Sequence, residues 1–136
     1  MPLTVKQVQS VIAGAHEHAA KLGAHVTVAV VDEGGHLQAL SRMDGAPPLS
    51  SQIAEAKAAS AALMRREGAE LRQMQEAFPA FFAQVDRVSR VPLLVGAGTM
   101  LIRQADSVVG ALSISGGWQP GQDDECAKAA LAALAS

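Results

Sequence analysis

The segment VAVVDEGGHLQALSRMDGA, Val28–Ala46, constrains the fold more than any other part of the chain. Two apolar, partly alternating runs stand on either side of Glu33-Gly34-Gly35. Glycine accepts the positive φ angles of a tight reversal, so the pattern predicts two antiparallel strands, Val26–Asp32 and His36–Arg42. Polar residues stand at the ends of these strands: Asp32, His36, Arg42 and Asp44.

Helical patterns precede and follow this predicted hairpin. Thr4 is a suitable N-cap for a first helix whose apolar residues repeat at helical spacing until Gly23. After the loop Asp44–Pro48, Ser50 or Ser51 is expected to cap a second helix that runs to about Glu67 and is ended by Gly68. A shorter helical piece is expected over Ala69–Ala77, before Pro79.

The second half of the chain has strand composition from Pro92 onwards. Three short strands are expected over Leu93–Val95, Met100–Arg103 and Val108–Ser115, and a last helix begins at Asp123 or Asp124. The element order is then α-β-β-α-(α)-β-β-β-α. It predicts a single α+β domain over residues 1–136 in which helices flank a five-stranded antiparallel sheet.

Composition excludes several classes of protein. The net charge is −2 at pH 7, and no run of Lys or Arg suggests a nucleic-acid partner. No apolar run approaches the ~20 residues that span a bilayer, and neither a signal peptide nor a disulfide is expected, so the predicted location is the cytoplasm. The one cysteine, Cys126, is either a small buried hydrophobe or a thiol activated at a helix start. The histidines have no zinc-site spacing, so no metal site is expected.

Lys57 is the strongest candidate functional residue that the pattern alone provides. On a helical wheel it shares the inward stripe of the second predicted helix with Ile53 and Met64. An ammonium group in that position must reach out to solvent, pair with a carboxylate or meet an anionic ligand, and all three alternatives remain open. Asp32 is the expected carboxylate, and a desolvated Asp32–Lys57 pair could transfer a proton or hold a carboxylate substrate.

Residues at the hairpin ends have two interpretations each. Asp32 and Arg42 either form a carboxylate–guanidinium pair that fixes the loops or join Lys57 at one rim of the sheet. His36 is either an exposed hairpin residue or an axial haem ligand or general base. In Ser113–Trp118, Ser115, Gly116 and Gly117 before a helix start form a candidate anion cradle, and Trp118 either lines a pocket or fills a subunit contact.

Four motifs carry a resemblance to a known family: Val28–Ala46, IAEAKAASA (Ile53–Ala61), VVGALSISGG (Val108–Gly117) and QDDECAKAAL (Gln122–Leu131). Together they resemble the GlcG/HbpS family of small haem-binding proteins, to which the C-terminal half of PduO-type cobalamin adenosyltransferases is similar. The resemblance implies a profilin-like arrangement, a homo-oligomer and haem as the ligand. Without an aromatic cluster to sandwich a porphyrin, contact would use aliphatic side chains, Met43 among them.

Three functional hypotheses follow. In the first, the protein binds haem or another anionic small molecule in a pocket near Lys57, Asp32, Arg42 and the Ser115–Gly117 turn. In the second, it is a small enzyme of a catabolic pathway that acts on a carboxylate or keto acid. Lys57 would then activate the carbonyl, Asp32 would move the proton and Arg42 would hold the carboxylate. In the third, it is an accessory subunit, which an exposed and unpaired Lys57 would favour.

Overall fold

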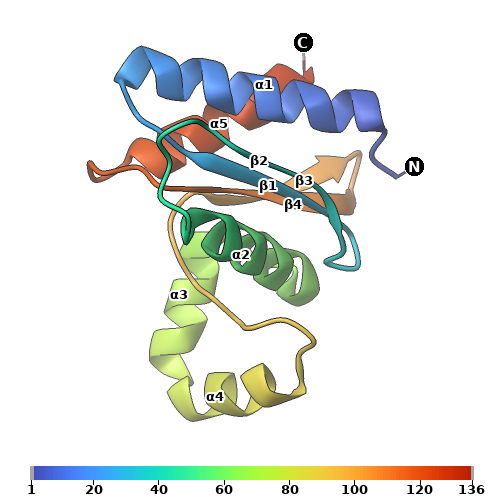
Figure 1. Ribbon diagram of the computed structural model, residues 1–136. Coiled ribbons are helices and arrows are strands. Elements are labelled where there is room, and N and C mark those ends of the chain that lie inside the picture. Colours follow the sequence, from blue (N-terminus) through green and yellow to red (C-terminus); the bar gives the residue numbers. More distant parts are fainter. Residues whose placement is uncertain (1, 136) are drawn as a thin grey trace.

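The computed structural model describes residues 2–135 as one sheet with helices on both faces (Figure 1). The elements in chain order are α1 (Val5–Leu22), β1 (Thr27–Asp32), β2 (Leu37–Arg42), α2 (Ser50–Met64), α3 (Gly68–Ala77), α4 (Pro79–Val88), β3 (Thr99–Gln104), β4 (Ser107–Ser115) and α5 (Gln122–Ala135). The sheet is antiparallel with the strand order β2-β1-β4-β3. Helices α1 and α5 cover one face, and α2 covers the other.

The sheet has four strands, so the expectation of five is wrong. The segment expected as an additional strand, Leu93–Val95, runs as a loop beside α2. Side chains take up its backbone donors: the Leu93 N–H donates to Asp86 Oδ1 at 2.6 Å and the Leu94 N–H donates to Ser60 Oγ at 2.9 Å. A short apolar run does not by itself distinguish a strand from a buried loop. The α+β class is confirmed, and the profilin-like arrangement stays a prediction.

The two faces of β1 enter different cores because side chains alternate along a strand. Val28 and Val30 pack under α1 and α5, and Ala29 and Val31 pack under α2. All four are fully buried. Burial of each valine contributes about 1.5 to 2 kcal/mol, so this central strand anchors both layers.

Helix α1 has the ends that its sequence predicts. The Thr4 hydroxyl accepts from the Gln7 N–H while the Gln7 side chain accepts from the Thr4 N–H, and Gly23 ends the helix at φ 69°. The ends of α2 differ from the prediction. The Ser50 hydroxyl bonds to Pro47 O and to Thr27 Oγ1 rather than capping the helix, and Arg65 at φ 55° ends it before Glu67.

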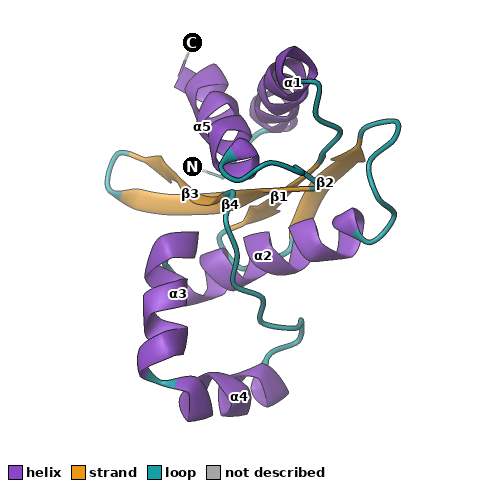
Figure 2. Cartoon of the chain, turned by 90° about the vertical axis from the view of Figure 1, so that its left-hand side faces the viewer, coloured by secondary structure: helices purple, strands orange, loops and turns teal. Residues whose placement is uncertain are grey.

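An arm made of α3 and α4 extends from the α2 side of the sheet (Figure 2). Gly68 begins α3 instead of ending α2, and Pro79 begins α4, a helix that the sequence reasoning missed. Proline fits the first turn of a helix, where its missing N–H would have no helical partner. Phe78 and Phe81 on this arm are 61% and 51% exposed. No helix in the described part of the chain is both long and apolar enough to cross a bilayer.

Candidate ligand-binding site

Lys57 lies on the face of α2 that packs against the sheet, and only 5% of the residue is exposed. Its Nζ donates to Ala97 O at 2.7 Å and to Ile114 O at 2.6 Å. The predicted inward orientation is therefore confirmed, and the side chain does not extend into bulk solvent. An ammonium has three donors, so one N–H remains without a partner among the described residues.

The carboxylates that act on Lys57 come from α5. Burial lowers the pKa of Lys57, while attraction to Asp123 and Asp124 raises it, and burial prevails. Burial raises the pKa of Asp123 in turn, against the attraction of Lys57 and a hydrogen bond from the Gly117 N–H. No oxygen of Asp123 lies within 4.0 Å of the Lys57 amine, so these two charged groups attract each other across a gap.

The two aspartates also hold the loops on either side of Lys57. Asp123 Oδ1 accepts from the Gly117 N–H at 3.0 Å, and Asp124 Oδ1 accepts from the Gly98 N–H at 2.7 Å. Sequence reasoning gave these residues only the task of starting a helix. No pattern along the chain signalled that the helix start would lie against Lys57, which is on a different element.

A cleft of about 570 Å³ opens beside the lysine, and we call it the Lys57 cleft. Its walls are mostly apolar, and its charged side chains are Lys57 and Asp123. Trp118, 87% exposed, and Leu49, 58% exposed, also line it. The complete lining is Pro47, Leu49, Ser50, Ile53, Lys57, Leu94, Val95, Gly96, Ser115, Gly116, Gly117, Trp118 and Asp123.

Glycines allow backbone to approach the charged groups closely. A Cβ on Gly96 would stand 2.8 Å from Lys57 Cδ, and a Cβ on Gly117 would stand 2.7 Å from Asp123 Oδ1. Gly116 has φ 111°, and its Cβ would stand 2.8 Å from His25 O. The structure thus brings the predicted Ser115–Gly117 turn, Trp118 and Lys57 to one cleft, and it adds Gly96 and Asp123.

Asp32 and Arg42 do not join this cleft. In the strand register Arg42 stands opposite Thr27, the first residue of β1. Asp32 is the last residue of β1, so Asp32 and Arg42 lie at opposite ends of the hairpin. The expectation that both meet Lys57 at one rim is wrong, because two strands joined by a tight turn place such residues a strand length apart. A catalytic role for Asp32 or Arg42 stays a prediction.

Asp32 fixes the turn instead. Its Oδ1 accepts from the Gly34 N–H at 2.9 Å, from the His36 N–H at 3.0 Å and contacts His36 Nδ1 at 3.2 Å. Burial raises the pKa of Asp32, but these hydrogen bonds and the charge of His36 together outweigh burial and hold the pKa below its ordinary value. Asp32 thus fixes a loop through two backbone N–H groups and His36, and not through the predicted pair with Arg42.

His36 and Met43 also lie outside the Lys57 cleft. The His36 side chain is 63% exposed at the hairpin turn. Met43 packs into the core on the α1 and α5 side, and its Sδ accepts from the Val26 N–H at 3.4 Å. The residues predicted to contact a cofactor are therefore divided between the cleft, the turn and the opposite layer.

The remaining candidate ligands are dispersed. His16 Nε2 contacts Ser41 O at 3.3 Å, and His18 Nε2 contacts Glu125 Oε2 at 3.1 Å. Burial, followed by the charges of Asp123 and Glu125, raises the pKa of Cys126 to about 11, which is opposite to an activated thiol. Within residues 2–135, no group of three His, Cys, Asp or Glu side chains could hold a metal ion.

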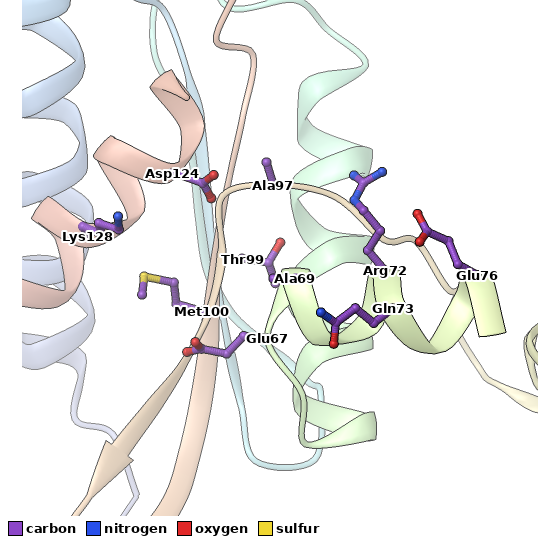
Figure 3. A pocket seen from close by; sticks show the side chains of 11 residues that line it. Glu67, Ala69, Arg72, Gln73, Glu76, Ala97, Thr99, Met100, Asp124 and Lys128 are labelled. Atoms are coloured by element: carbon purple, nitrogen blue, oxygen red, sulfur yellow. The ribbon is translucent and has the colours of Figure 1, made fainter. Parts of the chain in front are cut away.

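A second hollow of about 410 Å³ lies on the α3 side of the loop that carries Ala97 (Figure 3). Asp124 and Lys128 reach it from α5, while Arg72 and Glu76 reach it from α3. Arg72, Lys128 and three carboxylates line it, so it offers no surface of a single charge. Asp123 and Asp124, adjacent in sequence, thus line different hollows.

A family model described as haem degrading protein HbpS-like matches residues 3–132. The chain belongs to this family. The GlcG protein of Escherichia coli K12 is 46% identical to it over 65 residues, which are 48% of this chain and 48% of GlcG. The chain thus matches about half the length of that relative.

Two solved structures of similar fold cover almost the whole chain. A PduOC:haem complex has a TM-score of 0.87 and 27% identity over 98% of this chain and 95% of the other. A double mutant of Streptomyces reticuli HbpS has a TM-score of 0.82 and 30% identity over 98% of this chain and 88% of the other. The four-stranded sheet and its helices are therefore an architecture that this HbpS-like chain shares with both.

Proposed function

We propose that this HbpS-like protein binds a small, largely apolar molecule that carries a carboxyl group, in the Lys57 cleft. The observation that carries the proposal is a buried ammonium with one unpartnered N–H in a cleft with mostly apolar walls. An apolar body would contact Ile53, Leu94 and Val95, and its polar end would reach Lys57. Small-molecule sites generally combine apolar walls with a few placed polar groups.

Binding is favoured over chemistry at the lysine nitrogen. A nucleophilic amine must be neutral with a free lone pair. Nζ instead donates to Ala97 O and Ile114 O, and both bonds are strongest when it is a charged ammonium. This arrangement suits a group that holds a carboxyl oxygen better than one that attacks a carbonyl carbon.

Haem is the ligand that the haem complex of PduOC suggests. The apolar walls of the Lys57 cleft fit the edge of a macrocycle, and Lys57 fits a propionate. None of the residues that line the cleft is His, Cys, Met or Tyr, so the cleft does not fit coordination of the iron.

A second candidate, haem coordination at the hairpin turn, rests on a different observation. Asp32 holds Nδ1 of His36, which leaves Nε2 of an exposed imidazole available as an iron ligand. The predicted homo-oligomer also stays a proposal, and the exposed Phe78 and Phe81 of the arm provide apolar surface for it.

Trp118 offers a direct readout of ligand binding. It is the single tryptophan of a chain that has no tyrosine, and it lines the cleft. Phenylbutanoate should quench its fluorescence or shift the emission to the blue as the indole leaves water. The variant L49E places a carboxylate on an apolar wall and should weaken this binding about tenfold, equivalent to about 1.4 kcal/mol.

Leu63 provides a matched control. It is a leucine of α2, 41% exposed, and it lies beside Gly35 at the end of the helix opposite to the N-cap Leu49. L63E should bind phenylbutanoate as the wild type does. A wild-type titration without any change in Trp118 emission, or an equal loss in L49E and L63E, contradicts the proposal. Haemin titrations of L49E and H36A then assign any Soret shift to the cleft or to the turn.

A further inference from the structure

The Lys57 cleft holds two unused hydrogen-bonding groups of opposite kind. One is the third N–H of Lys57. The other is Asp123 Oδ2, since the only hydrogen bond that residues 2–135 make to that carboxylate is from the Gly117 N–H to Oδ1. No described atom bridges these groups, and more than 4.0 Å separates the amine from the carboxylate oxygens. The cleft thus provides one donor and one acceptor for the same ligand group.

The charges around Asp123 disfavour a second carboxylate. The charged groups that act on it are Lys57 from α2 and Asp124 from α5, and Asp123 itself helps to raise the pKa of the Cys126 thiol on α5. The loops of residues 94–98 and 115–117 carry no ionisable side chain. One ammonium already faces two carboxylates, so an ionised ligand would add a third negative charge in a partly desolvated place. Two carboxyl groups that share such a site retain one proton between them.

We propose that Asp123 determines the ligand class of the cleft, which binds a head group with an acceptor beside a donor, namely an uncharged carboxylic acid or a primary amide. This inference rests on the proposed function and refines it. The ligand carbonyl oxygen accepts from Lys57, and the ligand O–H or N–H donates to Asp123. When the ligand is a carboxylate in solution, the bound pair takes one proton from water, and no other bond changes. An amide brings its own donor and requires no proton.

The burial that raises the pKa of Asp123 supports this arrangement, because a carboxylate in that place gains from a donated proton. Because Lys57 and Asp123 do not form a direct ion pair, both groups remain available to a ligand.

The test compares phenylbutanoic acid with its primary amide at about pH 5.5 and about pH 8, with Trp118 fluorescence as readout. For the wild type, the dissociation constant of the acid should rise at least about tenfold between these values, and that of the amide should change less than about twofold. In D123N the amide side chain donates to an ionised carboxylate, so the acid should bind about tenfold more tightly than to wild type at the higher pH.

D106N is the matched control, because it makes the same substitution on the exposed turn between β3 and β4, at a residue that does not line the Lys57 cleft. It should keep the pH dependence. Calorimetry of the wild type in two buffers of different ionisation enthalpy counts proton uptake directly and needs no variant. Acid binding that is equally tight at both pH values, without proton uptake, overturns the inference but leaves the proposed function intact. Failure of both ligands to alter Trp118 emission contradicts the proposed function and the inference with it.

Discussion

Asp32 and Lys57 were both expected to take part in one site, and each belongs to a different kind of polar cluster. Asp32 is satisfied by residues two and four positions away, on an exposed turn. Lys57 donates two hydrogen bonds to carbonyls 40 and 57 positions away, in a place that is almost closed to water. A local cluster can form as soon as its turn forms, whereas the Lys57 cluster requires α2, β4, the 94–98 loop and α5 to be in place.

The difference also decides how much stability depends on each cluster. Loss of the Lys57 donor leaves the buried Ile114 O, which water does not reach easily, and the part-buried Ala97 O. Loss of an acceptor from an exposed turn leaves donors that water can satisfy. The Lys57 cluster should therefore dominate the free energy of unfolding, and three measurements can break or sharpen this contrast.

The largest effect is expected for K57M. It removes both hydrogen bonds to Ala97 O and Ile114 O and leaves Asp123 without its nearby cation. We expect the free energy of unfolding, measured by urea titration with circular dichroism, to fall by about 3 to 4 kcal/mol. K21M is the control, because Lys21 has a 70% exposed side chain and only a 3.8 Å contact to Glu17. A loss in K57M no greater than that in K21M would show that the cluster does not stabilise the fold.

A smaller loss is expected for G98A. Gly98 has φ 78°, and a Cβ there would stand 2.7 Å from Asp123 Cβ and 2.9 Å from Ile114 O. We expect the same urea titration to give a loss of about 2 to 3 kcal/mol, from backbone strain together with overlap. In G23A the φ of 69° is the only source of strain, because no atom of the described part of the chain lies within 4 Å of the added Cβ, and a loss of about 1 kcal/mol is expected. Equal losses in the two variants would mean that the loop moves aside freely.

The smallest effect is expected for D32A at the hairpin turn. It removes the acceptor of the Gly34 and His36 N–H groups and should cost about 1 kcal/mol at neutral pH. Because the folded state lowers the pKa of Asp32, its stabilisation is complete above the unfolded value of 3.8 and is lost as the pH falls through the folded pKa. Thermal unfolding of D32A and wild type should therefore converge in acid. A difference that is constant with pH would exclude the carboxylate charge as its origin.

The elements that the sequence predicts correctly are those with a local cause. Thr4 with Gln7 caps α1, Gly23 ends it, and the double glycine after Asp32 reverses the chain into β2. The errors are of two kinds. Leu93–Val95 has strand composition but takes its hydrogen bonds from side chains, and Pro79 begins a helix because the preceding helix has already ended at Ala77.

The candidate site divides in the same way. Periodicity places Lys57 on the inward face of its helix. The glycines before α5 predict a cradle for an anionic ligand, which stays a prediction, and the Gly117 N–H donates to Asp123 of the chain itself. Neither pattern contains the partner of the amine. Asp123 stands 66 residues after Lys57 in the sequence. It comes close to Lys57 of α2 only because of the order of β1 and β4 in the sheet.

The sequence by itself determined the hairpin, the caps of the first helix, the inward lysine and the glycine turn, because each depends on dihedral preferences and spacing within a few residues. Tertiary structure decided which carboxylate acts on Lys57, which carbonyls hold its amine, and that Asp32 and Arg42 stand at opposite ends of a strand. The physical reason is that electrostatic and hydrogen-bond partners are chosen by distance in space, and the antiparallel sheet brings together the ends of segments that are far apart along the chain.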